Sequence, residues 1–203
     1  LIKIVANKFA RFYIFVIRGT PMMVQSLIFY YAIFNLFKRT GMSVTEINRV
    51  WSLFISGLVT VSLNSTAYLA EVLRGGILAV DAGQMEAARS LGMTHWQAMR
   101  RVVFPQAIKN SLPAIGNEFI INIKDSSVLC VLGVSDLMFM TRSVAGIYYK
   151  GTECYLIAAT VYLFLTYLSS LLLKAITGRM TAPDNTKRRQ GNQTVDLGLP
   201  SSN

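Results

Sequence analysis

Four polar side chains recur at helical spacing inside an otherwise apolar stretch, residues 51–73. Thr60, Asn64, Tyr68 and Glu71 are separated by four, four and three residues, so in a helix they form one stripe along a single face. An ionised group at the centre of a bilayer costs about 3 kcal/mol on insertion scales, so in a membrane this stripe must face protein or water. It offers hydrogen bonds and charge to a polar solute. The alternative is that it joins helices by buried hydrogen bonds.

A second apolar stretch, residues 112–132, also carries charge. Its polar residues fall on two adjacent helix faces, with Glu118, Asn122 and Asp125 on one and Asn117 and Lys124 on the other. Lys124 and Asp125 are costly inside a membrane span unless they are paired. Ser126 and Ser127 follow them and can satisfy backbone groups if the helix breaks there. Transporters present backbone groups to ligands at such breaks.

A path for a solute requires these two stretches to meet across a water-filled cavity. The expected substrate path is lined by Asn64, Tyr68, Glu71, Arg74, Asn117, Asn122, Lys124, Asp125 and Ser126. Arg74, three residues after Glu71, is expected to pair with it near the cytoplasmic end of its helix. Charges of both signs are present, so a zwitterion fits the path, although the same charges could simply neutralise one another.

Residues for covalent or metal chemistry are scarce. His95 is the only histidine, which leaves no histidine metal cluster and no His-based catalytic triad. Cys130 and Cys154 have apolar neighbours and no metal-site spacing, so we interpret them as small buried side chains. No GxxxxGK[ST] sequence occurs, so this chain has no P-loop of its own. We expect no catalytic residue, no metal site and no cofactor bound by this chain.

Composition indicates that a membrane positions these residues. Of 203 residues, 53% are hydrophobic and 15% are charged, which is less charge than a soluble domain carries. The net charge is +10, but the basic residues gather at the ends of apolar segments and do not form a stripe with interleaved aromatics, so nucleic-acid binding is not expected. We predict one all-α membrane unit over residues 1–182, and a disordered basic cytoplasmic tail over residues 183–203.

Four membrane spans are predicted, at residues 22–37, 51–73, 112–132 and 153–175. The first is short for a hydrocarbon core of about 30 Å, so we expect it to borrow residues that precede Pro21. Residues 1–20 are expected to form a helix at the cytoplasmic interface. Residues 38–49 and 133–152 are expected to form a polar loop and an irregular segment on the outer side. The basic clusters place the C-terminus in the cytoplasm.

A polar segment of 25 residues, 81–105, separates the second and third predicted spans. Asp81 and Gln84 have the spacing of a helix cap and its reciprocal partner, and Thr94 and Gln97 repeat that spacing. Gly92 lies where the first of the two helices should end, because glycine adopts the left-handed conformation at no steric cost. The segment is therefore predicted to be two short helices joined by a glycine hinge.

Two further features of this segment bear on its role. Ala87 and Ala88 leave the first short helix thin on one side, so another surface could approach it closely. Pro105 and Pro113 are predicted to mark new helix starts. The segment is either a solvated loop between spans or a docking element for a soluble partner.

The docking interpretation gains support from a resemblance. Glu86-Ala87-Ala88, then Gly92, then the apolar residues before Pro105 resemble the EAA loop of ABC importer permeases, with Val102 and Phe104 where that family often has Ile and Leu. Four flanking motifs look like the polar amino acid subgroup: Arg18-Gly19-Thr20-Pro21, Ala67-Tyr68-Leu69-Ala70-Glu71 with Arg74-Gly75-Gly76-Ile77, Pro105-Gln106-Ala107, and Lys124-Asp125-Ser126-Ser127. The resemblance covers roughly residues 9–175.

The resemblance implies a type I ABC importer transmembrane domain in the bacterial inner membrane, with a cytoplasmic coupling helix. Its five-helix unit would have a further span before Leu1. The implied partners are a second permease subunit, identical or not, two ATP-binding subunits that use ATP, and an extracytoplasmic solute-binding protein. The residues implied to dock the ATPase are Glu86, Ala87, Ala88, Leu91, Gly92 and His95.

Three alternatives remain beside an amino acid importer. The chain could be a permease for another small polar solute. A polar channel outside the ABC class could use the same stripe, but it would not explain a capped cytoplasmic helix with a thin side. A membrane enzyme would require a nucleophile with a base, or metal ligands, and a single histidine supplies neither.

Overall fold

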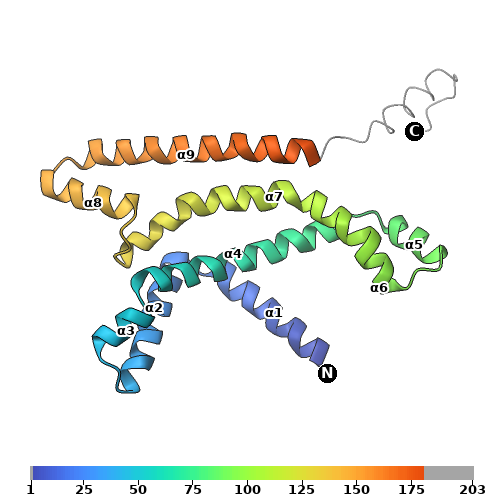
Figure 1. The fold of residues 1–203 in the computed structure, drawn as a ribbon, viewed down its shortest axis with the longest axis horizontal. Helices are drawn as coiled ribbons and strands as arrows, with labels where there is room; N and C mark the ends of the chain where they lie inside the picture. The colour runs from blue at the N-terminus through green and yellow to red at the C-terminus, as the bar shows by residue number, and fades with distance from the viewer. Residues whose placement is uncertain (1, 181–203) are drawn as a thin grey trace.

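The computed structural model describes residues 2–180, and within that range it is helical throughout, with no strand (Figure 1). The predicted tail, residues 183–203, lies outside the described residues. The α-helices are α1 (Ile2–Gly19), α2 (Met22–Arg39), α3 (Val44–Val50), α4 (Leu53–Leu78), α5 (Ala82–Ser90), α6 (His95–Ala98), α7 (Phe104–Asp125), α8 (Leu137–Tyr148) and α9 (Gly151–Met180). A π-helix, Met99–Val103, joins α6 to α7, and a 3-10 helix, Ser126–Val131, follows α7.

Membrane-spanning length is concentrated in a few helices. Within residues 2–180, α4 and α9 are each long and apolar enough to cross a membrane, and α1 with α2 would make a third span if the bent pair counts as one. The third predicted span, residues 112–132, corresponds in part to α7, which has 22 residues but carries charged side chains. Its insertion therefore depends on the helices packed beside it.

The first predicted span differs from the expectation. Residues before Pro21 do not extend α2 in line, because α1 and α2 are bent by 112° at this point. Proline has no N–H to continue the helix, and it disfavours the helical conformation in the preceding residue. Thr20 ends α1 by donating its hydroxyl to the Val16 carbonyl at 2.8 Å. The two halves of this span therefore point in different directions.

Both segments predicted as loops contain helices. In residues 38–49, the hydroxyl of Ser43 caps α3, and the Glu46 carboxylate accepts from the Ser43 backbone at 2.8 Å. The hydrogen bonds from the hydroxyl and backbone of Ser43 hold the pKa of Glu46 below its usual range. In residues 133–152, Asp136 caps α8 by accepting from the Phe139 backbone at 2.7 Å. The loop predictions were wrong because these local caps start helices within otherwise polar or Gly-containing segments.

The third predicted span changes geometry where its serines begin. The α-helix ends at Asp125 and tightens into the 3-10 helix, in which the Ser126 hydroxyl donates to the Ile123 carbonyl at 3.0 Å. The predicted break is therefore a tightening and not an unwinding. Pro105 lies in the first turn of α7, as predicted, but Pro113 lies inside α7 and does not start a helix.

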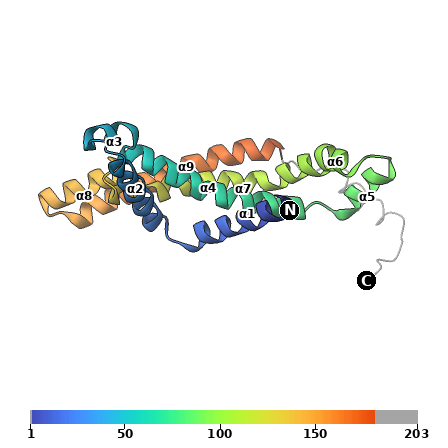
Figure 2. The ribbon, with the colours of Figure 1, turned by 90° about the horizontal axis from the view of Figure 1, so that it is seen from below.

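The centre of the molecule is the contact between α4 and α7, which lie side by side in both views (Figures 1 and 2). Small residues allow this approach. A Cβ at Gly76 would lie 2.7 Å from the Ala107 carbonyl oxygen, and one at Gly57 would lie 2.8 Å from a Leu129 methyl. Large apolar side chains, by contrast, are exposed along the outer helices, including Leu163 and Phe164 on α9. This distribution is typical of a chain surrounded by lipid and partner subunits.

Candidate functional site

The polar stripe of α4 faces the bend between α1 and α2. Asn64 donates its side-chain amide to the Gln25 side-chain oxygen at 3.3 Å, and the Arg18 guanidinium lies over the Tyr68 ring, 5.1 Å from its centroid. Thr60 is fully buried and donates to the carbonyl of Ser56 in its own helix, so it serves packing. After Thr60, the stripe therefore lies against α1 and α2, with Asn64 and Tyr68 making the contacts. We call this part of α4 the α4 wall.

Two arginines share one carboxylate at the Glu71 end of this stripe. The predicted pair of Glu71 and Arg74 is confirmed, with a shortest N–O distance of 2.8 Å. Arg18 adds a second cation at 3.8 Å from the same carboxylate. The side chains of Glu71, Arg18 and Arg74 are 26%, 42% and 65% exposed, so the cluster is open to small molecules while it carries one net positive charge.

The polar face of α7 meets α4 only in part. Asn122 donates to the Ser65 hydroxyl at 2.8 Å, which joins the two helices within the predicted path. Glu118 lies within electrostatic reach of both Arg18 and Asp125. Ion pairs within the described residues are limited to the two made by Glu71, so Lys124 and Asp125 do not pair with Glu71 or Arg74.

The remaining predicted path residues lie at the edges of this arrangement. Asn117, Lys124 and Asp125 are exposed on α7, and Ser126, the first residue of the 3-10 helix, donates to the Ile123 carbonyl at the end of α7. Sequence reasoning missed Arg18 and Gln25 as members of the site. A charged residue and an amide on either side of Pro21, within apolar surroundings, were the available signal.

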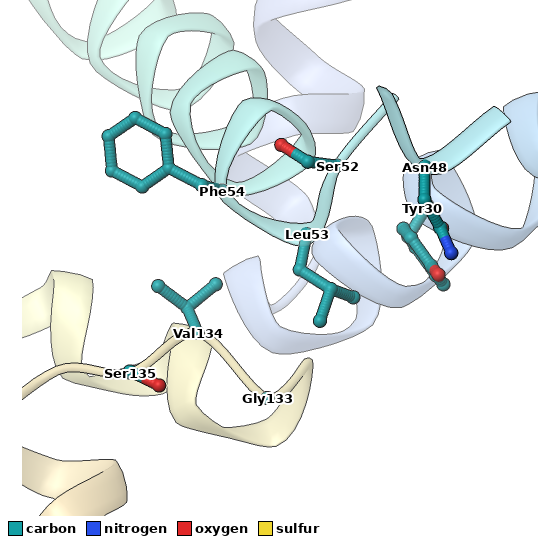
Figure 3. Close-up of a pocket in the computed structure, with 8 residues that line it drawn as sticks. All are labelled: Tyr30, Asn48, Ser52, Leu53, Phe54, Gly133, Val134 and Ser135. Atoms are coloured by element: carbon teal, nitrogen blue, oxygen red, sulfur yellow. The ribbon is translucent and has the colours of Figure 1, made fainter. Parts of the chain in front are cut away.

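The opposite end of the molecule from α5 and α6 contains an open pocket of about 480 Å³. It is lined by Tyr30, Asn48, Ser52, Leu53, Phe54, Gly133, Val134 and Ser135 (Figure 3). Leu53, at the start of α4, lies between Tyr30 and Asn48 on one side and the loop that contains Gly133 on the other. This pocket is mainly apolar, and its polar side chains come from Tyr30, Asn48, Ser52 and Ser135.

The polar segment forms two short helices, as predicted, at one end of the molecule (Figure 1). Gly92 adopts a φ of +84°, and the backbone of Gly92 and Met93 donates to the carbonyls of Arg89 and Ala88, which is the Schellman arrangement. Thr94 and Gln97 form the predicted capping box at 3.3 and 2.9 Å. The hinge geometry thus follows from local caps.

The other predicted cap is half right. Asp81 accepts from the Gly83 backbone at 2.7 Å, but Gln84 does not reach back to Asp81. Its side-chain oxygen instead accepts from the Gln106 amide at 3.2 Å, and Gln106 also donates to the Val102 carbonyl at 3.0 Å. A long-range partner outcompetes the local one, so the first short helix is tied to the start of α7.

Most of the predicted docking residues are exposed, namely Glu86, Ala87, Leu91, Gly92 and His95. Ala88 is the exception, since it is 4% exposed and faces inward. Leu91 is 82% exposed, and Trp96, which the sequence reasoning did not single out, is 72% exposed. Large apolar side chains this exposed at a polar end of a molecule are typical of a surface that contacts another protein.

Metal ligands are not clustered in the part of the chain that the structure describes. Within it, no three His, Cys, Asp or Glu side chains come close enough to hold an ion. Cys130 is buried with Arg142 at 3.7 Å from its sulfur, and Cys154 is partly exposed. The contacts that the structure shows at the site are hydrogen bonds, ion pairs and one cation–π contact.

Comparison with known proteins agrees with this arrangement. Residues 2–182 match the family described as binding-protein-dependent transport system inner membrane component. The chain is 34% identical to the glutamine transport system permease protein GlnP of Escherichia coli strain K12, over 87% of this chain and 76% of the relative. It is 37% identical to the probable amino-acid permease protein YxeN of Bacillus subtilis strain 168, over 90% of this chain and 78% of the relative.

A solved structure extends the similarity to the fold. A crystal structure of an amino acid ABC transporter with histidines superposes with a TM-score of 0.72 at 44% identity, covering 88% of this chain and 76% of that one. The predicted all-α fold of an ABC importer permease is thereby confirmed, and the relatives are transport components and not enzymes. The chain therefore belongs to the family of binding-protein-dependent transport system inner membrane components.

Proposed function

We propose that this chain is the permease subunit of an ATP-driven amino acid importer, and that a separate subunit hydrolyses the ATP. The observation that carries the proposal is the unit of α5 and α6. It presents Leu91 and Trp96 to solvent, and it continues through the π-helix into α7, which packs against α4, the helix that carries the polar stripe. A solute path and a docking surface are thus parts of one continuous element.

The proposed assembly follows from the family. Two permease subunits, identical or not, would enclose the path, and an extracytoplasmic solute-binding protein would deliver the solute at the end that holds the 480 Å³ pocket. The opposite end, which carries α5 and α6, has a cluster of basic residues that favours a cytoplasmic location, namely Arg89, Arg100, Arg101 and Lys109. The chain would then be a multi-pass protein of the bacterial inner membrane with its C-terminus in the cytoplasm.

An amino acid suits the chemistry of the α4 wall. Arg18 offers a guanidinium for a carboxylate, and the Asn64 side-chain oxygen can accept from an ammonium. The named activities of relatives, glutamine transport and amino acid permeation, point to the same class. We propose that the substrate path includes, besides Arg18, the residues Asn64, Tyr68, Glu71, Arg74, Asn117, Asn122, Lys124, Asp125 and Ser126.

The ATPase-docking surface is proposed to consist of Glu86, Ala87, Leu91, Gly92 and His95, with Ala88 holding the helix from inside. Gly92→Asp and Glu86→Lys should leave the protein in the membrane but weaken its co-purification with the ATPase. The first places a charged side chain at a left-handed position, and the second reverses the charge of an exposed side chain in the middle of α5. Co-purification and ATPase stimulation equal to wild type in both variants would refute this surface.

Transport is tested in proteoliposomes that contain the permease, its ATPase and the binding protein, with a panel of radiolabelled amino acids that includes glutamine. Glu71→Gln is nearly isosteric, and we expect loss of uptake with retained abundance and retained ATPase association. The same change at Glu153, which is exposed in the first turn of α9, is the matched control and should transport normally. If Glu71 only joins helices, Glu71→Gln should instead lower abundance or melting temperature.

Asp125→Asn tests the α7 side of the path separately. Asp125 is exposed and takes part in neither of the two ion pairs, so replacing its carboxylate with an amide should leave the packing of α4 on α7 intact. Reduced uptake at normal abundance would support a path that extends to the end of α7. Normal uptake kinetics at normal abundance would show that Asp125 is not part of the path. The path would then be confined to the α4 wall.

A further inference from the structure

We propose that Gln25 is a positioning residue for the substrate path. It fixes the bend between α1 and α2, and it thereby holds Arg18 over Tyr68 and against Glu71. The inference rests on the proposed transport function and adds to it a residue that acts through Arg18. Gln25 lies in the first turn of α2 and is only 5% exposed, which is unusual for a carboxamide unless its hydrogen bonds are made.

The Gln25 amide nitrogen supplies donors to the end of α1. It lies 2.7 Å from the Ile17 carbonyl, 2.9 Å from the Thr20 carbonyl and 2.7 Å from the Thr20 hydroxyl. The last carbonyls of a helix have no partner within it, and Pro21 cannot supply one because it has no N–H. Gln25 therefore replaces the backbone donors that the bend removes, and it does so across the bend, from α2 back to α1.

The Gln25 side-chain oxygen connects the same bend to α4. It accepts from the Asn64 amide at 3.3 Å, on the face that carries Tyr68 and Glu71. One buried side chain of α2 thus bonds to both α1 and α4. By comparison, Ser26 beside it is fully buried but donates only within α2, to the Met23 carbonyl at 2.7 Å.

The position of Arg18 depends on the hydrogen bonds of Gln25, because Arg18 is next in sequence to a residue whose carbonyl accepts one of them. Gln25 holds the carbonyl of Ile17, and Arg18 is the next residue along α1. From there the Arg18 guanidinium reaches the Glu71 carboxylate at 3.8 Å, and it is the cation of the cluster that comes from outside α4. If the bend opened, Arg74 would remain with Glu71, since both lie on α4, but Arg18 would leave.

A distance measurement tests this geometry without requiring transport. Spin labels at Lys8 on α1 and Thr66 on α4, both exposed, would report the angle between the helices in the assembled complex, in a background without native cysteines. Gln25→Met keeps the length of the side chain and removes its polar atoms, so we expect a shifted or broadened distance distribution. Ser26→Ala removes a neighbouring buried hydroxyl and should leave the distribution unchanged.

Two further variants separate the donors of Gln25 from its acceptor. Gln25→Glu retains oxygens for Asn64 but loses the donors to α1, so it should alter the distribution as Gln25→Met does. Asn64→Leu removes only the link to α4 and should preserve the bend. A wild-type distribution in Gln25→Met, or an equal change in Ser26→Ala, would overturn the positioning role.

Uptake then connects the bend to function. Gln25→Met should lower amino acid uptake about tenfold at normal abundance, which corresponds to the loss of one or two hydrogen bonds to a buried group. Wild-type uptake in a variant whose bend has opened would also overturn the proposal. If the wild type transports none of the amino acids tested, the proposed function fails, whereas the distance measurement still decides whether Gln25 sets the position of Arg18.

Discussion

Substituting Gly76 with alanine probes the point where α4 and α7 come closest. A Cβ at Gly76 would lie 1.8 Å from the Ser111 hydroxyl oxygen and 2.7 Å from the Ala107 carbonyl oxygen. The hydroxyl can rotate away, but the carbonyl belongs to the backbone of α7, so the helices must separate. Gly75 precedes it in the same helix, and a Cβ there would meet no heavy atom within 4 Å. The two glycines form a matched pair.

The expected difference in stability between the two variants can be estimated by cancelling the contribution that they share. Each exchanges glycine for alanine near the end of one helix, which gains up to about 1 kcal/mol of helix propensity, and this term largely cancels between them. The remaining difference is the cost of overpacking at Gly76, about 1–3 kcal/mol. We therefore expect Gly75→Ala to be neutral or stabilising and Gly76→Ala to be destabilising by comparison. Ser111→Ala should rescue only part of the loss, because the Ala107 carbonyl remains.

The assay is thermal unfolding in detergent, followed on both variants and on the Gly76→Ala, Ser111→Ala double variant. Coupled activity is measured on the same samples as uptake per ATP hydrolysed, since this crossing joins the end of α4 to the start of α7. Equal melting temperatures for Gly75→Ala and Gly76→Ala would show that the crossing tolerates a methyl group, and would refute the view that contact at Gly76 sets the spacing of the helices.

Three other experiments test the polar segment and its tie to the start of α7. Gly92→Val should weaken co-purification with the ATPase more than Gly92→Asn, because asparagine tolerates the left-handed conformation and valine does not; equal effects would mean that the φ of +84° is not required. Gln106→Leu removes the hydrogen bond to Gln84 and should lower uptake per ATP hydrolysed while ATPase association persists; an unchanged ratio would contradict a role for this tie in coupling. A cysteine at Thr94, in a background without native cysteines, should be labelled only from the cytoplasm, and labelling from outside would reverse the proposed orientation.

Local signals accounted for what was predicted correctly about the fold. The spacing of Thr94 and Gln97 and the position of Gly92 were enough to predict two short helices, because caps and left-handed glycines act over three or four residues. Apolar length likewise predicted the segments that became α4 and α9. The same reasoning missed α3 and α8 because the caps Ser43 and Asp136 were treated as loop residues.

Tertiary partners account for what was missed. Gln84 has the right spacing to cap its own helix, yet it bonds to Gln106, which is distant in the sequence. The stripe of α4 was identified from its helical period. Its neighbours, Arg18 on α1 and Gln25 on α2, reach it because α1 and α2 are bent by 112°, and the period of apolar residues does not predict that angle. A one-dimensional pattern gives the face of a helix and not the identity of what covers that face.

One helix, α4, connects the parts of the molecule on which the function depends. Its start borders the 480 Å³ pocket, its stripe faces the bend of α1 and α2, and Gly76 near its end contacts the first half of α7, which follows the short helices α5 and α6. Glu71 lies five residues before Gly76, about 7.5 Å along the helix axis. A displacement of α7 at the crossing would therefore act on α4 within two turns of the carboxylate that holds two arginines. Because Arg74 moves with α4 and Arg18 does not, such a displacement changes the separation between Arg18 and Glu71 first. A solute carboxylate that entered the proposed path would alter the same separation.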